Sequence, residues 1–529
     1  MSDSDFVIYG LPFWSPIPEI SLGKQIYDSL RQSTDEEIAY INVHTERKLL
    51  YKDFLHMSCQ LANSLQNCGY KINDVIAICS ENNNNFFVPV VSALFVGMIS
   101  APLNHTYTER ELLHAINITK PKVVFCSKAV IGNFEKLKKT VNYIERIIIL
   151  EQYDKVDGYD TINEFVENNA SKSFNVEHFR TTDVNTFNHL AALLCSSGTT
   201  GLPKAVMATH DNISVRINQS HDPRFSLSQD VTLGLLPFFH AFGFMTNIGA
   251  IIDRKKYRIS VLYMVPSIMF ALAKNPLVTK YDLSSVKEIL CGAAALSTEL
   301  EATVKHRLPS AKVIRQGYGL TEATLAVTLA PLNDLKTGSS GKVVPGMSCL
   351  VRDPKTGQIL GPNKVGELCF KGRLVTKGYY GNEEATRSTF SPDGWLFTGD
   401  LGYYDEDHHF YIIDRLKELI KYKGYQVAPA ELESILIHYP GVEDVGVVGK
   451  PDEKAGELPT AFIATQPNSK ITEQEIIDFV ASQVSHPKQL HGGVYFIDKI
   501  PRNSSGKILR QAMPTNSTIC ILLIQCLHE

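Results

Sequence analysis

Residues 195–204 (CSSGTTGLPK) bring together the chemical groups that bind a phosphate. Glycines allow the backbone to approach a ligand closely, and consecutive backbone N–H groups can form a nest for an anion. The hydroxyl side chains donate to phosphate oxygens, and Lys204 adds a positive charge. The lysine has no Gly before it and no Ser or Thr after it, so the P-loop pattern is not met. From composition alone, a surface loop rich in Ser, Thr and Gly is an equally good interpretation.

The sequence around this loop alternates between strand-like and helix-like patterns. Apolar runs of strand length are found at residues 74–79, 122–126, 146–150 and 190–194. Helical spacing of apolar residues is found at residues 51–66 and 86–96. Strands that alternate with helices predict an α/β fold with a parallel sheet, in which ligands bind beyond the carboxyl ends of the strands. The glycine-rich loop follows such a strand end, where a ligand is expected.

Length and composition exclude several classes of protein. The 529 residues are 44% hydrophobic and 20% charged, which predicts several folded domains rather than a disordered chain. The formal net charge of −4 argues against a protein that coats nucleic acid. The ten cysteines form no C-x-x-C pair and the amino end has no signal-peptide pattern, so we expect free thiols in a reducing, intracellular compartment. Residues 86–103 are interrupted by Pro, Ser and Gly, which favours a buried core helix over a membrane span.

Further motifs follow the loop in order, and together they resemble the adenylate-forming superfamily of acyl-CoA synthetases, 4-coumarate–CoA ligases and beetle luciferases. They are residues 316–322 (QGYGLTE), 338–346 (GSSGKVVPG), 394–400 (GWLFTGD), 414–417 (DRLK), 421–426 (KYKGYQ), 429–433 (PAELE) and 501–507 (PRNSSGK). The likeness is strongest to the insect luciferase-like branch. It implies a large region of several subdomains with parallel-rich sheets at residues 1–413, a hinge at 414–417, and a small mobile α+β domain at 418–529.

The resemblance implies a reaction in two steps. A carboxylate attacks the α-phosphate of ATP to give an acyl-adenylate and pyrophosphate, and the thiol of coenzyme A then displaces AMP to give a thioester. The implied cofactors are ATP, Mg²⁺ and coenzyme A, and the implied substrate is a hydrophobic carboxylic acid, either fatty or arylpropenoic. Such phosphoryl chemistry needs cations and aligned donors. Two alternatives stay open: a luciferin monooxygenase that uses the same adenylate with molecular oxygen, and a degenerate nucleotide-binding paralogue.

The family's motifs assign nucleotide-binding roles to residues of this sequence. The phosphate loop would act through Ser196, Ser197, Gly198, Thr199, Thr200, Gly201 and Lys204. Adenine and the α-phosphate would be bound by Gln316, Gly317, Tyr318, Gly319 and Thr321. Glu322 would hold Mg²⁺, and Asp400 would bind the ribose through its two acceptor oxygens. Arg415 would reach the ribose or a phosphate. Outside this context, Glu322 would be a first-turn helix acid and Asp400 a turn residue.

The resemblance also assigns residues to the reacting groups. Lys507 would be the main catalytic cation between the carboxylate and the α-phosphate, with Thr321 and Glu322 acting beside it. Lys417 would be the hinge, and after rotation Lys421 and Gly424 would face the active site, with Gly424 lining the thiol tunnel. Without the resemblance, a lysine near the carboxyl end is normally solvated, and Lys421 would sit on a charged edge strand.

The acyl pocket would be small or apolar, which suits a hydrophobic acid. Its residues would be Arg216, His240, Phe242, Gly292, Ala293 and Leu325. His240 would gate or orient the carboxylate, although a lone histidine between aromatics is more often a core residue. Arg216 is nearly as well explained as a helix-surface residue. The aliphatic Leu325 favours a fatty acid over a heteroaromatic luciferin.

Three departures from the family's pattern stand out. Ala205 follows Lys204 where Gly is usual. Residues 251–259 are shorter than in relatives by roughly 15 to 20 residues, about one strand and two helical turns, and loss of an interior strand would expose core or shift the register. The carboxyl end reads Leu-His-Glu rather than the peroxisomal Ser-Lys-Leu of many relatives, so we expect a cytoplasmic location. We also expect a monomer without a nucleic-acid partner or an integral membrane segment.

Overall fold

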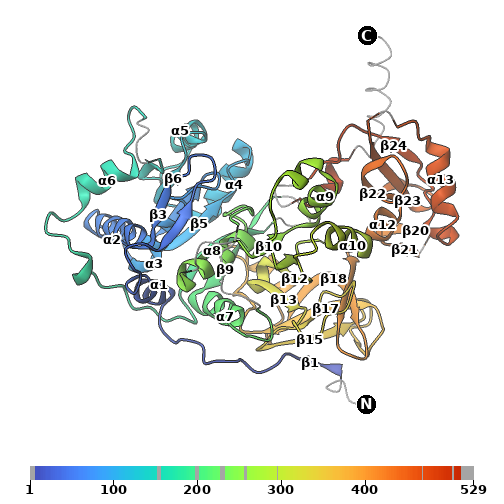
Figure 1. The fold of residues 1–529 in the computed structure, drawn as a ribbon, viewed down its shortest axis with the longest axis horizontal. Coiled ribbons are helices and arrows are strands. Elements are labelled where there is room, and N and C mark those ends of the chain that lie inside the picture. The colour runs from blue at the N-terminus through green and yellow to red at the C-terminus, as the bar shows by residue number, and fades with distance from the viewer. Residues whose placement is uncertain are drawn as a thin grey trace, which may run out of the picture. The chain divides into compact units, whose positions relative to one another are not determined.

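The computed structural model divides the chain into two compact units (Figure 1). The described residues are 6–151, 156–196, 202–226, 233–254, 259–294, 296–423, 425–467, 469–502 and 506–513. The large unit comprises Val7–Cys349 and Cys369–Phe397, and the small unit comprises the rest. The fold is mixed α/β, as predicted. The hinge predicted at residues 414–417 lies within the small unit by this division and stays a prediction.

The first sheet of the large unit confirms the predicted alternation of strands and helices. Its strand order is β7 (Arg146–Ile149), β6 (Val123–Cys126), β4 (Val75–Cys79), β5 (Ile99–Leu103), β8 (Leu190–Ser196) and β9 (Lys204–Thr209). All neighbours are parallel except β8 and β9, which form an antiparallel pair. The continuous apolar runs of β4 and β6 are buried throughout, as expected for a sheet covered on both faces.

Two helices contribute much of the core beside this sheet. Helix α2 (Tyr51–Asn67) buries one face, whereas all ten residues of α3 (Phe87–Val96) are buried. Helix α3 ends at Gly97, whose positive φ of 74° suits glycine. The apolar segment at residues 86–103 is therefore a core helix followed by β5, and none of the helices in the described ranges is long and apolar enough to cross a bilayer.

The second sheet of the large unit carries residues 316–320 of the predicted adenine motif on its central strand. Its order is β10 (Val261–Met264), β11 (Glu288–Cys291), β12 (Val313–Leu320), β13 (Leu325–Leu329) and β14 (Lys342–Val343). Strands β10 to β12 are parallel, and β12 to β14 are antiparallel. Helices α8 (Ala241–Asp253), α9 (Pro266–Lys274) and α10 (Thr298–Arg307) belong to the same part of the chain.

The shortened segment before β10 does not disturb this sheet. Strand β10 is the terminal strand of the order, and it pairs with β11 in a regular register from Val261 opposite Glu288 to Met264 opposite Cys291. Side chains of both strands, including Leu262 and Ile289, are buried in one apolar cluster. The expected exposure of core or shift of register is therefore not found in the described part of this region.

The small unit contains an antiparallel sheet flanked by helices. Its order is β21 (Tyr425–Val427), β20 (Ile420–Tyr422), β23 (Gly456–Thr465) and β22 (Val442–Asp452), with β24 (Val494–Phe496) parallel to β23. Helix α12 (Pro429–Leu436) begins with proline at its first turn, where the missing N–H is not needed. Helix α13 (Glu473–Ala481) begins with a capping box formed by Thr472 and Glu475.

The remaining elements connect these sheets. In the large unit they include β1 (Ile8–Tyr9), α1 (Leu22–Leu30), β2 (Ile38–Ile41), β3 (Lys48–Leu50), α4 (Glu109–Thr119), α5 (Ile131–Thr140), α6 (Ile162–Asn169), α7 (His210–Ser220) and α11 (Glu383–Thr389). The small unit also contains β16 (Ile359–Leu360) and β19 (Phe410–Arg415). Strands β15 (Met347–Arg352), β17 (Gly366–Gly372) and β18 (Leu396–Tyr404) have residues in both units.

Candidate active site

The two ends of the predicted phosphate loop lie opposite each other at the end of the β8–β9 hairpin that this loop connects. Ser196 and Lys204 are paired residues of these strands. The Oγ of Ser196 is buried and has no hydrogen-bond partner among the described residues, so its donor is available to a ligand. The predicted loop residues Ser197, Gly198, Thr199, Thr200 and Gly201 lie outside the described residues.

A tyrosine joins Lys204 to the predicted metal ligand. The Nζ of Lys204 lies 4.7 Å from the centre of the Tyr379 ring, which attracts a cation through its face. The Tyr379 hydroxyl donates a 2.8 Å hydrogen bond to Oε1 of Glu322. Tyr379 and Glu322 are both buried. The cation, ring, hydroxyl and carboxylate therefore form one continuous chain of contacts.

Glu322 itself is held by its backbone. It lies in the short 3-10 turn η4 (Thr321–Ala323), which follows β12 and also contains the predicted Thr321. The carbonyl of Glu322 accepts hydrogen bonds from the N–H and the hydroxyl of Thr376, both at 2.9 Å. A buried, fixed carboxylate fits Mg²⁺, which proteins bind through one or two carboxylates together with substrate phosphates. The described residues contain no group of three or more His, Cys, Asp or Glu placed to hold a metal.

Gly319 of the predicted adenine motif is required by the close approach of two strands. Strand β12 has a register shift between Tyr318 and Gly319. A Cβ on Gly319 would overlap the carbonyl of Leu325, so only glycine fits there. The Tyr318 ring packs against Phe370, with ring centres 6.1 Å apart. These contacts explain the motif locally, while the adenine-binding role of Gly317, Tyr318 and Gly319 stays a prediction.

Most of the predicted acyl-pocket residues are brought together. Phe242, Ala293 and Leu325 belong to one apolar cluster, which also contains Leu236 and Val265. Gly292, the residue before Ala293, lies between this cluster and the adenine motif. A Cβ there would lie 3.3 Å from the Gly317 carbonyl oxygen and 3.6 Å from the Phe242 ring. The apolar cluster therefore adjoins the nucleotide motif.

Three residues at or next to this apolar cluster have an unusual backbone conformation. Ala293, Thr324 and Leu325 have positive φ angles of 71°, 50° and 95°. Such conformations are costly for residues with a Cβ, and they persist where function or packing requires them. Two of these three residues are predicted to line the acyl pocket. The strain is thus consistent with a shaped binding site at this point.

Gln316 anchors the start of the adenine motif. Its side chain accepts a hydrogen bond from the Leu296 N–H at 3.3 Å and donates to the Leu296 carbonyl at 3.4 Å. Leu296 lies on the segment that follows Gly292 and Ala293. The amide therefore links the nucleotide motif to the segment predicted to line the pocket, so in this structure Gln316 has a positioning contact.

His240 and Arg216 each form a local hydrogen bond. His240 caps the first turn of α8, where its Nδ1 accepts the Phe242 N–H at 3.2 Å, so the neutral ring carries its proton on Nε2. Arg216, on α7, donates to Oε1 of Gln219 at 3.1 Å. Burial lowers the pKa of the Arg216 guanidinium; Tyr263 opposes this effect and Arg315 adds to it.

The small unit brings together Asp400, the predicted ribose ligand, and Arg415, predicted to reach the ribose or a phosphate. Asp400 and Arg415 are paired residues of β18 and β19, and Nε of Arg415 lies 3.3 Å from Oδ1 of Asp400. Asp400 is buried. Lys421 is an exposed residue of β20, and Lys507 lies half-buried in the segment at residues 506–510. Gly424 lies outside the described residues.

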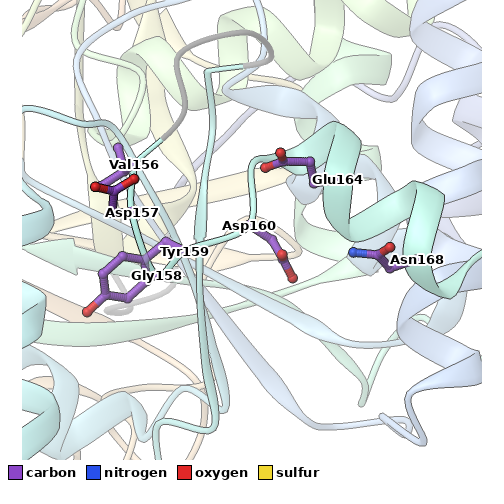
Figure 2. Close-up of a pocket in the computed structure, with 7 residues that line it drawn as sticks. All are labelled: Val156, Asp157, Gly158, Tyr159, Asp160, Glu164 and Asn168. Carbon is purple, nitrogen blue, oxygen red and sulfur yellow. The ribbon is translucent and has the colours of Figure 1, made fainter.

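A surface hollow elsewhere in the large unit is not this site. Figure 2 shows its walls, and its volume is about 460 Å³. It is lined by Val156, Asp157, Gly158, Tyr159, Asp160, Glu164 and Asn168, none of which is a predicted site residue. The Glu164 carboxylate is already used to cap α6, where it accepts from Thr161.

Sequence reasoning missed Tyr379. It lies in residues 375–381 (VTKGYYG), a segment without an unusual charge or hydroxyl pattern. A buried tyrosine is usually a core residue, and only the contacts with Lys204 and Glu322 distinguish this one. The signal is therefore three-dimensional and could not be found from spacing along the chain.

Comparison with known proteins covers almost the whole chain. The profile described as AMP-binding enzyme matches residues 28–380, and that of the AMP-binding enzyme C-terminal domain matches residues 431–507. Luciferin 4-monooxygenase of Photuris pensylvanica is 44% identical, covering 96% of this chain and 97% of its own length. The 4-coumarate-CoA ligase 1 of Narcissus pseudonarcissus is 35% identical over 95% of each chain.

Solved structures share this fold. A natural red-emitting luciferase from Phrixothrix hirtus superposes with a TM-score of 0.70 at 38% identity, covering 98% of this chain and 99% of its own. ATP-bound MatB from Rhodopseudomonas palustris superposes with a TM-score of 0.81 at 27% identity, covering 93% of this chain and 98% of its own. Both matches extend over large and small units alike.

Proposed function

The chain belongs to the AMP-binding enzymes of the adenylate-forming superfamily, and on that premise we propose that it activates a hydrophobic carboxylic acid with ATP and transfers the acyl group to coenzyme A. The observation that carries this proposal is the position of Gly292 between the Gly317 carbonyl and the Phe242 ring. An acid whose apolar part lay against Phe242 and Leu325 would present its carboxylate beside the nucleotide motif.

The residues of the large unit would bind the nucleotide and the acid. Lys204 and the Ser196 hydroxyl, which has no hydrogen-bond partner in the described part of the chain, would bind the β- and γ-phosphates, and Glu322 would hold Mg²⁺. When bound, the metal neutralises phosphate charge. His240 would donate from Nε2 to the carboxylate of the acid, because its Nδ1 is already used as an acceptor.

The residues of the small unit would act on the two transfer steps. Asp400 would accept hydrogen bonds from the ribose hydroxyls. Lys507 would lie between the attacking carboxylate and the α-phosphate, where a cation lowers the repulsion of two anions as the new O–P bond forms and pyrophosphate leaves. After rotation about Lys417, Lys421 and Gly424 would face the acyl-adenylate while the thiolate of coenzyme A attacks its carbonyl and AMP leaves.

A screen of carboxylic acids tests this proposal. Pyrophosphate release would be measured with ATP, Mg²⁺ and either lauric, oleic or cinnamic acid, and thioester formation would be followed by mass spectrometry after coenzyme A is added. We expect acid-dependent pyrophosphate and a matching thioester, with the fatty acids preferred because Leu325 and Phe242 form an aliphatic and aromatic wall. ATP left intact with every acid would contradict the proposal.

Luciferin oxygenation is the second candidate function, favoured by the 44% identity to a luciferin 4-monooxygenase. It would use the same adenylation followed by molecular oxygen. Light emission with luciferin, ATP and Mg²⁺, together with no thioester from any acid in the screen, would select it over the ligase. ATP binding in calorimetry without pyrophosphate release would instead select a degenerate nucleotide-binding protein.

A further inference from the structure

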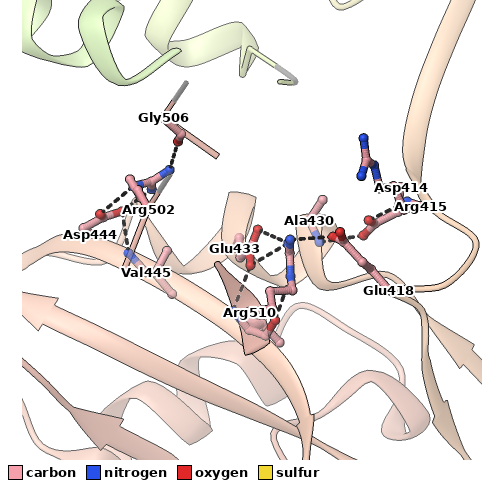
Figure 3. A network of polar contacts seen from close by, with 11 residues as sticks. Asp414, Arg415, Glu418, Ala430, Glu433, Asp444, Val445, Arg502, Gly506 and Arg510 are labelled. Carbon is pink, nitrogen blue, oxygen red and sulfur yellow. Dashed lines mark hydrogen bonds and ion pairs between the residues drawn. The ribbon is translucent and has the colours of Figure 1, made fainter. Parts of the chain in front are cut away.

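The segment that carries Lys507 is bracketed by two arginines of the small unit (Figure 3). On one side, Arg502 donates from Nη1 to the Gly506 carbonyl at 2.8 Å. Its Nε and Nη2 donate to Asp444 of β22 at 3.1 and 2.7 Å. Arg502 also forms an antiparallel bridge with Ile508. The residues on both sides of Lys507 are therefore attached to the edge of β22 through Arg502.

On the other side, Arg510 reaches three separate elements. Its Nη1 donates to Oε2 of Glu418 at 2.6 Å, and its Nη2 donates to both carboxylate oxygens of Glu433 at 2.9 and 2.8 Å. Its Nε donates to the Val447 carbonyl of β22 at 3.1 Å. The side chain is 19% exposed, so solvent screens these ion pairs less than pairs at the surface. Only the planar fork of arginine supplies this set of donors.

The same network includes the predicted hinge. Glu418 directly follows residues 414–417, and the Asp414 carboxylate accepts the Ala430 N–H at 3.0 Å in the first turn of α12. Glu433, one turn further along α12, accepts the Val447 N–H at 2.8 Å. Arg510 thus links Glu433 of α12, Val447 of β22 and Glu418 beside the predicted hinge to the segment after Lys507, as Figure 3 shows.

We propose that Arg510 is a positioning residue for Lys507. Arg510 fixes the segment that carries the lysine to Glu418 and Glu433, so that this segment moves together with the hinge. The proposal rests on the proposed function. Lysine has a flexible four-carbon stem, so a displaced backbone would leave its ammonium off the reaction path. Misplacement by about 1 Å costs on the order of 100-fold in rate. The network holds the backbone rather than the ammonium, so it affects the position of Lys507 and not its charge.

Two half-reactions separate this role from a general loss of structure. The first is pyrophosphate release from ATP and acid, and the second is thioester formation from a supplied acyl-adenylate and coenzyme A, which does not need Lys507 as the bridge to the α-phosphate. For Arg510→Lys, we expect the kcat of pyrophosphate release to fall about 10- to 100-fold while the KM for ATP stays within about twofold of the native value. The rate of thioester formation should stay within about threefold of the native rate. The matched control is Lys488→Gln, which removes an ion pair from Glu431 of the same helix.

Hydrogen exchange gives a readout that does not depend on activity. In Arg510→Gln, we expect the amides of residues 506–513 to exchange at least about tenfold faster while those of β23 keep their protection. Equal loss in both half-reactions, a change confined to the KM for ATP, or unchanged exchange at residues 506–513 would overturn the proposal. A parent protein that releases no pyrophosphate with any acid would instead refute the proposed function, and the exchange measurement would still decide the role of Arg510.

Discussion

At the scale of single residues, Tyr379 has two tasks that can be separated chemically. Its ring faces the Lys204 ammonium and its hydroxyl holds Glu322. Neither partner is near it in the sequence, so no local pattern predicts the arrangement. The candidate site could be predicted where residues are grouped in motifs, such as Ser196 and Lys204, but not where a single side chain connects two motifs.

Replacing this tyrosine by phenylalanine should weaken the metal site while sparing the lysine contact. Tyr379→Phe keeps the ring and removes a hydrogen bond to a carboxylate, which contributes about 1.5 kcal/mol or roughly tenfold. We expect the Mg²⁺ concentration for half-maximal ATP binding in calorimetry to rise about tenfold, and pyrophosphate release to need correspondingly more Mg²⁺. Tyr9→Phe, at an exposed position, is the control. An unchanged Mg²⁺ dependence would show that Glu322 does not need this hydroxyl.

A buried histidine makes a second prediction at this scale. Nδ1 of His210 accepts the Leu22 N–H at 3.0 Å, and burial, with His189 adding to it, lowers the pKa of His210 to about 3 from 6.5. The unfolded chain therefore binds more protons between these pH values, so stability is complete above pH 6.5 and falls as the pH drops toward 3. The expected loss is about 1.4 kcal/mol per pH unit.

Urea unfolding at pH 5.5 and 7.5 tests this dependence. When the pH is lowered from 7.5 to 5.5, the free energy of unfolding of the native protein should fall by about 1 kcal/mol more than that of a His210→Gln variant. Substitution of the exposed His44 by Gln serves as the comparison. An equal pH dependence in the protein and in His210→Gln would show that this ring does not stay neutral in the folded state.

At the scale of elements, the sequence predicted strands better than the contacts between them. The apolar runs at residues 74–79, 122–126 and 146–150 indicated β4, β6 and β7 because buried parallel strands are continuously apolar. The register shift at Tyr318 and the regular pairing of β10 with β11 could not be predicted, since both depend on neighbouring strands far along the chain. The exposed core or shifted register expected at the shortened segment is not found in the described residues there.

A buried ion pair joins β11 and β12 of the second sheet, and removal of one partner alone should be strongly destabilising. Arg315 Nε donates to Oε1 of Glu288 at 2.7 Å, and the two side chains are only 2% and 3% exposed. Arg315→Met would leave a buried carboxylate unpaired, which costs about 3–5 kcal/mol, whereas Arg315→Met combined with Glu288→Leu should recover most of this loss. Thermal unfolding of the single and double variants measures the difference. A double variant as unstable as the single one would contradict this account of the sheet.

At the scale of the whole molecule, the proposed function assigns residues of both units to one reaction. The large unit brings together Lys204, Glu322 and the apolar cluster around Phe242. The small unit holds Lys507 on a segment fixed by Arg510. The order of motifs predicted both sets, because each motif is local, whereas the network around Arg510 joins residues that are far apart in sequence and had to be seen in the structure.

The most direct test is a single-turnover measurement of pyrophosphate release with ATP, Mg²⁺ and the best acid of the screen, comparing the native protein with Lys507→Ala. The account predicts rapid release by the native protein and a rate lower by on the order of 100-fold in the variant, since a positioned cation at the transferred phosphoryl group is lost. ATP binding by calorimetry should stay within about threefold. Release by Lys507→Ala at the native rate, or a native protein that leaves ATP intact with every acid, would contradict it.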